Sequence, residues 1–68
     1  MNHIVTRRLR ELFYSETQYE TAGRLNTALS VVSRWVNGQA KPSADLIIRI
    51  CKEYNVSADW ILGLSDVK

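Results

Sequence analysis

A single cysteine, Cys51, and a single histidine, His3, are all that this 68-residue chain offers for cross-linking. One cysteine forms no internal disulfide, and these two side chains cannot supply the four ligands of a structural zinc site. A chain this short has core for one domain, which contributes only about 3–5 kcal/mol of stability. The sequence therefore predicts one domain, residues 1–68, that depends on tight helix packing or on self-association.

Basic and acidic residues are unevenly distributed along the chain. Residues 1–42 carry a net charge of +3, whereas the remaining residues carry −1. The acid-free stretch 21–44 contains three basic residues: Arg24, Arg34 and Lys41. If the protein binds a polyanion, we expect contact along that stretch.

The chain lacks the run of about 20 apolar residues that a membrane span needs, and its first residues hold no apolar run suited to a signal peptide. A lone cysteine also suits a reducing compartment. We therefore expect a cytoplasmic protein in which Cys51 is a small core residue.

Apolar residues recur at helical spacing, and no stretch alternates for long enough to form a strand. The expected fold class is therefore all-α, with a first helix over about residues 3–14. A second helix starts at Gln18, behind the capping box Thr17-Gln18-Tyr19-Glu20, and stops near Asn26.

Three further helices are expected after the second one. The third follows Thr27 and ends at Asn37-Gly38, a strong turn signal. Ser43 caps a fourth helix, which breaks at Asn55. Ser57 caps a short last helix that stops at Gly63.

The chain is expected to be ordered over about residues 3–64. Beyond that core, residues 65–68 are predicted to be a frayed tail.

Residues 17–38 have the features of two short helices joined by a tight turn. Helices that cross steeply need a small side chain where they meet, supplied by Ala22, and the turn needs a left-handed residue, supplied by Asn26. Val32 and Trp35, three residues apart, anchor the second of the two helices. Together these features form a helix-turn-helix pattern.

Two segments, TQYETAGRL at 17–25 and SRWVNG at 33–38, resemble the phage-repressor helix-turn-helix family of the Cro and XRE type. The likeness extends through Lys41-Pro42-Ser43 and through NVSADWILG at 55–63. The resemblance implies a compact five-helix, lambda-repressor-like domain with its helix-turn-helix at residues 18–36. It also implies a regulator of phage or prophage type that binds double-stranded DNA as a homodimer.

The resemblance further implies roles for individual residues. The third helix would lie in the major groove with five residues facing the bases: Ala28, Leu29, Ser30, Ser33 and Arg34. Phosphates would be contacted by residues beside the motif: Gln18, Asn37, Gln39 and Lys41. The start of the last helix would form the dimer seam through Ala58 and Trp60.

Each of these roles has a plainer alternative. Arg34 can read guanine through its two donors, or it can contact a phosphate. Leu29 can pack on a thymine methyl or simply cover part of the core, and Trp60 can be a core residue. Because few long polar side chains face the groove, we expect DNA shape to contribute to recognition. The basic cluster of the first helix can contact phosphates or serve solubility: Arg7, Arg8 and Arg10.

The sequence departs from the family pattern at several positions. Asn26 replaces the usual glycine of the turn, and Thr21 replaces an aliphatic residue, so we expect the second helix to be anchored less firmly. Ala28 stands where Ser or Thr often caps the third helix, which makes Thr27 an alternative cap.

The connection between the first two helices is about two residues shorter than usual. In the family a basic residue late in the first helix often pairs with a Glu just before the Asn-Gly, where this chain has Val36. With the shortened connection the basic position falls on Phe13. Because hydrophobic packing often substitutes for a buried ion pair, we predict that Phe13 touches Val36.

No nucleophile–base pair and no phosphate-binding loop is evident, so the sequence predicts no enzyme activity, no cofactor and no metal. The leading interpretation is a sequence-specific double-stranded DNA-binding transcriptional regulator, a repressor that reads the major groove with its third helix. The alternative is a protein-interaction module, such as the antitoxin of a toxin–antitoxin pair.

Overall fold

The computed structural model describes residues 3–68, which form helices and no strand. The five helices are α1 (Ile4–Leu12), α2 (Gln18–Leu25), α3 (Leu29–Val36), α4 (Ala44–Tyr54) and α5 (Ala58–Ile61). The all-α fold class and the helix-turn-helix at residues 18–36 are therefore confirmed.

The first helix ends earlier than predicted, at Leu12 instead of residue 14. Phe13 is its C-cap, and the Phe13 side chain turns into the core, where its ring packs 5.3 Å from that of Tyr54. Leaving the helix at this point lets an aromatic side chain join the core while the chain turns toward α2.

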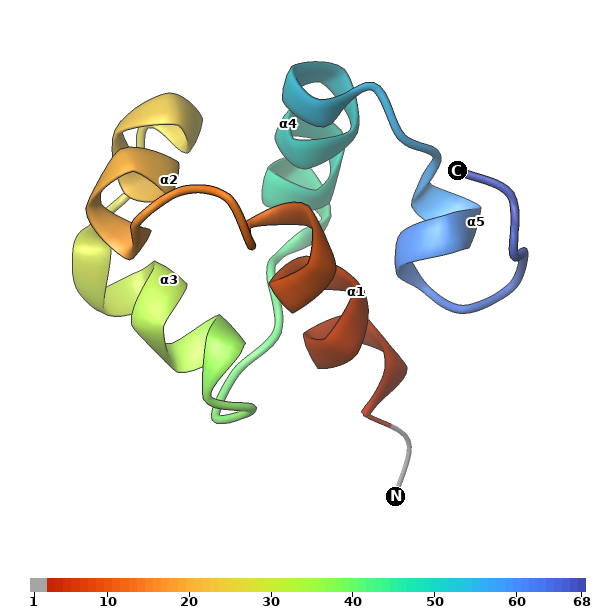
Figure 1. Cartoon of the computed structure of the whole chain (residues 1–68), viewed down its shortest axis with the longest axis horizontal. Coiled ribbons are helices and arrows are strands. Elements are labelled where there is room, and N and C mark those ends of the chain that lie inside the picture. Colours follow the sequence, from red (N-terminus) through yellow and green to blue (C-terminus); the bar gives the residue numbers. More distant parts are fainter. Residues whose placement is uncertain (1–2) are drawn as a thin grey trace.

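The helices surround one core, and α1 lies between the α2–α3 pair and α5 (Figure 1). α2 packs on α3 and on α4, whereas α1 packs on α3 and on α5. In Figure 1, α2 and α3 lie at one side of the molecule and α5 lies at the other. The two helices of the motif are thus held from two directions, α2 by α4 and α3 by α1.

The core draws on every helix and is formed by ten buried apolar residues: Val5, Leu9, Phe13, Ala22, Leu25, Val32, Trp35, Ile50, Trp60 and Ile61. The two anchors predicted for the third helix, Val32 and Trp35, are both buried. Ala22, the small residue predicted for the crossing of the two helices, is buried on α2, which packs on α3. Cys51 packs against this core but is only partly buried, and that burial raises the pKa of its thiol.

Most helix ends follow the predicted capping residues. Thr17 forms the complete capping box with Glu20, while Ser43 and Ser57 accept hydrogen bonds from the amides that open α4 and α5. Asn26 ends α2 in the left-handed conformation with φ of 54°, and Asn55 ends α4 in the same way. Local polar residues therefore determine where α2, α4 and α5 begin and where α2 and α4 end.

The start of α3 differs from the alternative in which Thr27 is the cap. Its N-cap is Ala28, which contributes no side-chain hydrogen bond. Thr27 instead belongs to the turn that closes α2, because its backbone amide donates to the Ala22 carbonyl at 2.9 Å.

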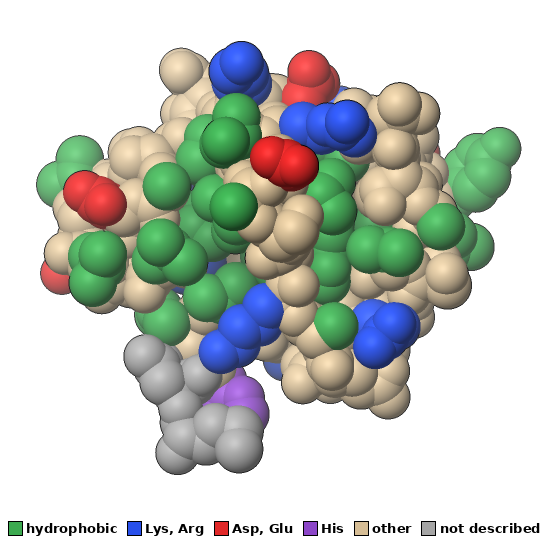
Figure 2. Space-filling view, turned by 180° about the vertical axis from the view of Figure 1, so that it is seen from behind, with side chains coloured by type: hydrophobic (Ala, Val, Ile, Leu, Met, Phe, Trp, Pro, Cys, Tyr) green, Lys and Arg blue, Asp and Glu red, His purple; other side chains and the backbone are tan. Residues whose placement is uncertain are grey.

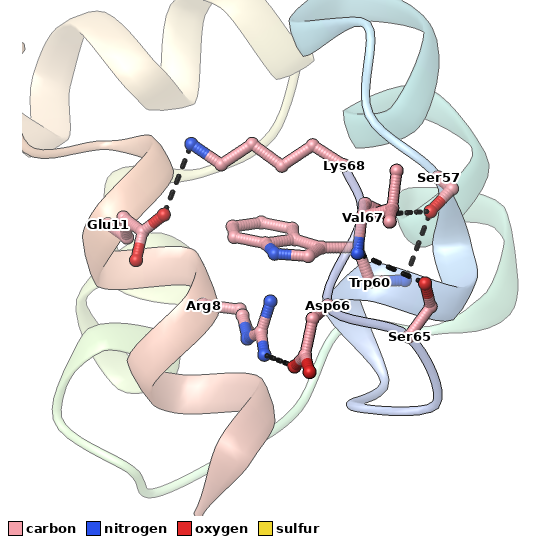
Figure 3. A network of polar contacts seen from close by, with 8 residues as sticks. All are labelled: Arg8, Glu11, Ser57, Trp60, Ser65, Asp66, Val67 and Lys68. Carbon is pink, nitrogen blue, oxygen red and sulfur yellow. Dashed lines mark hydrogen bonds and ion pairs between the residues drawn. The ribbon is translucent and has the colours of Figure 1, made fainter.

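The C-terminal residues, which the sequence predicts to be a frayed tail, make specific contacts in the structure. Lys68 pairs with Glu11 of α1 at 3.1 Å, and Asp66 pairs with Arg8 of α1 at 3.3 Å (Figure 3). The backbone amide of Ser57 also donates to the Lys68 carbonyl at 2.9 Å. These partners lie 11 to 58 positions away along the chain, which is why local sequence signals did not indicate them.

Candidate DNA-binding surface

The third helix presents a polar face that points away from the core. Val32 and Trp35 point inward, and the opposite side of α3 carries Ser30, Ser33 and Arg34. Ser30 and Arg34 are exposed, and Ser33 is half-buried. Three of the residues predicted to face DNA bases therefore share the outer face of one helix.

The other two residues predicted to face the bases lie at the start of α3. Ala28 is the exposed N-cap, and Leu29 is the first helical residue with 48% of its surface exposed. An exposed leucine beside a polar helix face can contact a thymine methyl. Both residues are placed where they extend the outer face of α3 toward the turn.

Two predicted phosphate contacts, Asn37 and Gln39, form the turn that follows α3. The Gln39 amide donates to the Arg34 carbonyl at 2.8 Å, and the Asn37 side chain lies 3.4 Å from the Ser33 hydroxyl. Gly38 between them has φ of 74°, in the left-handed region that favours glycine. The turn therefore places both polar side chains directly beside the outer face of α3.

Gln18 is the first residue of α2 and is exposed. The capping box there joins the Thr17 amide to the Glu20 carboxylate at 2.8 Å and the Glu20 amide to the Thr17 hydroxyl at 3.0 Å. This carboxylate reduces the positive character of the helix N-terminus. A phosphate contact here consequently depends on the Gln18 side chain or amide itself.

The basic residues of the acid-free stretch 21–44 have different surroundings. Arg24 pairs with Glu16 at 3.4 Å and lies over the Tyr54 ring. Arg34 and Lys41 are both exposed, and within residues 3–68 neither lies at ion-pair distance from a carboxylate. Their charges are therefore available to a polyanion.

The arginines of α1 do not form one uniform basic patch. Arg7 is exposed, whereas Arg8 pairs with Asp66 and lies over the Trp60 ring. Arg10 donates its Nε to the Val36 carbonyl at 2.7 Å. Two of the three side chains thus have specific structural partners, which neither the local pattern of α1 nor its charge indicated.

The predicted Phe13–Val36 pair lies next to this hydrogen bond. Phe13 and Val36 line the same small cavity, together with Arg10 and Val32. Their direct contact stays a prediction.

Thr21 anchors α2 through a polar network and not through the aliphatic packing usual at this position. It is fully buried, and its hydroxyl donates to the Glu16 carboxylate at 2.9 Å. The Tyr54 hydroxyl of α4 donates to the same carboxylate, which also pairs with Arg24. Burial, followed by the hydrogen bond to Glu16, raises the pKa of Tyr54. The expected weaker anchoring at Thr21 is therefore offset by hydrogen bonds that link α2 to α4.

The predicted dimer seam is only partly accessible. Trp60 is 2% exposed, and its ring lies between the Arg8 guanidinium and the Lys68 ammonium group (Figure 3). Trp60 is thus a core residue in this structure, whereas Ala58 is half-buried at the start of α5.

Other apolar side chains near α5 do reach the surface. Ile48 and Leu62 are exposed at an apolar groove that α1, α4 and the loop before α4 complete, with five further lining residues: Val5, Lys41, Pro42, Ala44 and Ile47. Figure 2 shows the molecule from behind, where hydrophobic side chains spread across the surface between scattered charged groups.

Comparison with known proteins supports the class that this geometry defines, a helix-turn-helix domain. A family model described as helix-turn-helix matches residues 17–61, which include α2, α3, α4 and α5. No match was found among curated proteins or among solved structures. The chain belongs to the helix-turn-helix family of the Cro and XRE type, and it is a DNA-binding transcription regulator of that type. None of the described helices is long and apolar enough to cross a membrane.

Proposed function

We propose that this protein is a sequence-specific repressor that places α3 in the major groove of double-stranded DNA. The observation that carries the proposal is the outer face of α3, where Ser30, Ser33 and Arg34 point away from the anchors that hold the helix. Occupying an operator is sufficient to block transcription, whereas activation needs a further contact with the transcription machinery. Repression is therefore the activity that this surface supports by itself.

The residues of this surface divide into two roles. Arg34 reads guanine, and Leu29 contacts a thymine methyl, with Ala28, Ser30 and Ser33 completing the face toward the bases. Phosphate contacts hold the protein in register and supply most of the affinity without sequence preference. They come from four exposed residues on both sides of α3: Gln18, Asn37, Gln39 and Lys41.

We further propose that the protein acts in the cytoplasm as a homodimer, with the seam at α5. Ala58 would contact the second copy directly, and the buried Trp60 would support the seam from within. The exposed side chains of Ile48 and Leu62 beside α5 supply the apolar area that a stable contact needs.

Selection of bound sites from a random pool of duplex DNA tests the proposed function. We expect enrichment of two similar half-sites whose centres lie about one helical turn, roughly 10 base pairs, apart. A pool without enrichment at low salt would contradict sequence-specific recognition. Enrichment of a single half-site would contradict the dimer while leaving the recognition helix in place.

The alternative is a protein-interaction module such as an antitoxin, which would use the apolar groove at Ile48 and Leu62 to bind a protein partner. Salt titration separates the two functions. For a DNA-binding protein, the logarithm of the affinity falls linearly with the logarithm of the salt concentration. The slope is about −0.9 for each phosphate contact. Weak, salt-insensitive DNA binding would favour the alternative.

A further inference from the structure

In each helix of the motif, the last backbone carbonyl accepts a hydrogen bond from an arginine outside the motif. Arg49 of α4 donates its Nη1 to the carbonyl of Leu25, the last residue of α2, at 3.1 Å. Arg10 of α1 donates its Nε to the carbonyl of Val36, the last residue of α3, at 2.7 Å. The same two packing pairs, α4 with α2 and α1 with α3, connect the motif to the rest of the domain.

These bonds satisfy groups that a helix leaves unpaired. The last four carbonyls of a helix have no partner within it, and the C-terminal end carries partial negative charge, which favours a cationic donor. At the end of α3, backbone amides of the following turn donate to the carbonyls of residues 33, 34 and 35. The fourth carbonyl, that of Val36, receives its hydrogen bond from Arg10.

The carbonyl contacts are the specific interactions that these two side chains make. The ion pairs found within residues 3–68 involve Arg8, Arg24 and Lys68, and neither Arg10 nor Arg49 is among them. Arg7, Arg10, Arg34 and Arg49 are all exposed. What distinguishes Arg10 and Arg49 is a side-chain hydrogen bond to the last carbonyl of a helix.

Control of a helix end matters most for α3, which has only eight residues. Val32 and Trp35 hold this helix against the core at its centre. The hydrogen bond from Arg10 adds a restraint at its C-terminal end. Reading a base requires hydrogen bonds of defined length and direction, whereas attraction to phosphates changes slowly with distance. A small tilt of α3 would therefore reduce selectivity far more than overall affinity.

We propose that Arg10 and Arg49 are positioning residues, which fix the angle of α3 and of its supporting helix α2 for base recognition without contacting DNA themselves. This rests on the proposed function, in which α3 reads bases. It also assigns Arg10 to neither of the roles that the sequence suggested, phosphate contact or solubility.

The test compares variants on a selected operator and on a scrambled duplex over a range of salt concentrations. For Arg10→Met we expect the ratio of the two affinities to fall about tenfold, as for loss of one hydrogen bond to a charged group. Affinity for the scrambled duplex and the salt slope stay unchanged. Arg49→Met lowers the ratio by about threefold, because it acts on α3 through α2. Arg10→Lys restores part of the ratio, since a lysine can still donate to the carbonyl.

Arg7→Met is the matched control, because Arg7 is an exposed arginine on the same helix. It should leave the affinity ratio unchanged. Measurements are made well below the melting temperature of each variant, so that a loss of stability alone cannot lower the ratio.

Three results would overturn the proposal. A salt slope that becomes shallower by about 0.9 in Arg10→Met, with both duplexes weakened alike, would make Arg10 a phosphate contact. A lower melting temperature with an unchanged ratio would make both arginines purely structural. Equal ratios for Arg10→Met and Arg10→Lys would show that the hydrogen bond has no role.

Hydrogen exchange in the protein without DNA tests whether Arg10 restrains the end of α3, independently of the proposed function. We expect faster exchange of the Gly38 and Gln39 amides in Arg10→Met than in Arg7→Met, because these amides bond to the end of α3. If the wild-type protein selects no DNA sequence, the proposed function fails, and the exchange rates still decide whether Arg10 restrains α3. Unchanged exchange rates would contradict a restraint of α3 by Arg10 even if DNA recognition is confirmed.

Discussion

The two ends of the domain differ in which side chains they leave exposed. At the α2–α3 end, polar side chains face outward, and the charges of Arg34 and Lys41 are not engaged within residues 3–68. At the α5 end, the chain covers its own aromatic residue, since residues 65–68 and Arg8 enclose Trp60 (Figure 3). One end thus leaves charges available to a polyanion, whereas at the other end Trp60 is covered by internal contacts and Leu62 stays exposed.

This contrast shows which features of the molecule are set locally. The outer face of α3 follows from helix periodicity, because Val32 and Trp35 determine which side points inward. The covering of Trp60 at the α5 end follows from ion pairs and hydrogen bonds between distant segments, so that its accessibility depends on contacts elsewhere in the chain. The predictions below would break or sharpen this comparison.

The largest expected effect is the loss of the anchor beneath the recognition helix. Trp35→Ala should lower the free energy of unfolding by roughly 3–5 kcal/mol, because it empties a fully packed site. Urea denaturation measures this, and Trp35→Phe provides a milder variant if the alanine variant does not fold. Leu29→Ala is the control, since its half-exposed side chain should contribute under about 1 kcal/mol. Equal effects of both substitutions would contradict the assigned inner and outer faces of α3.

Removal of the proposed base-reading side chain should affect selectivity next most strongly. Arg34→Ala should reduce the preference for the operator over other sequences by about 1–3 kcal/mol, because its bidentate pair with guanine is lost. Competition binding with operator variants measures this preference. An unchanged preference would remove Arg34 from base recognition.

Lys41→Ala should weaken binding to all duplexes alike and make the salt slope shallower by about 0.9, as expected for one phosphate contact. The comparison of Lys41 with Arg34 separates affinity from selectivity on the same surface. A change in selectivity on Lys41→Ala would contradict the division into phosphate and base contacts.

The Tyr54–Glu16 network should give a measurable pH dependence. Because the folded structure raises the pKa of Tyr54 above its ordinary value of 10.0, the stability it contributes is complete below about pH 10 and is lost as the pH rises above it. Tyr54→Phe should lower stability at pH 7 by about 1 kcal/mol and should flatten the decline above pH 10. Tyr14→Phe, at an 89% exposed residue, should change neither. If stability falls in parallel above pH 10 in the wild type and in Tyr54→Phe, the role of the Tyr54 hydroxyl would be contradicted.

The smallest effect is expected for the residues that cover Trp60. Lys68→Met removes one partly exposed ion pair and one cation–π contact, so stability should fall by about 1 kcal/mol or less. Quenching of Trp60 fluorescence by iodide should nonetheless increase, because the ring becomes more accessible. Val67→Ala, which changes an exposed side chain in the same segment, is the control. Unchanged quenching in Lys68→Met would mean that Lys68 does not cover the ring.

Features that depend on neighbouring residues could be predicted from the sequence. The capping box at Thr17, the caps Ser43 and Ser57 and the left-handed Asn26 are local signals, and each marks a helix end in the structure. Periodicity likewise predicted the burial of Trp35. Such signals act within about one helical turn, so reading them requires no knowledge of the tertiary fold.

Contacts between distant residues could not be predicted in this way. Arg10 meets Val36 across 26 positions, and Arg8 meets Asp66 across 58, yet nothing in α1 distinguishes these two arginines from Arg7. Thr21 was recognised as a departure from the family, but its partner Glu16 became apparent only from the structure. A long polar side chain can reach many partners, and the fold selects one of them.

The central claim is that the outer face of α3 reads bases, and a paired substitution in protein and DNA tests it most directly. The operator guanine nearest Arg34 is replaced by 7-deazaguanine, which lacks the N7 acceptor, and affinity is measured for the wild type and for Arg34→Ala. We predict that the modified base weakens the wild type at least several-fold and has almost no effect on Arg34→Ala, because the two changes remove the same hydrogen bond. Equal losses for both proteins would contradict base reading by Arg34.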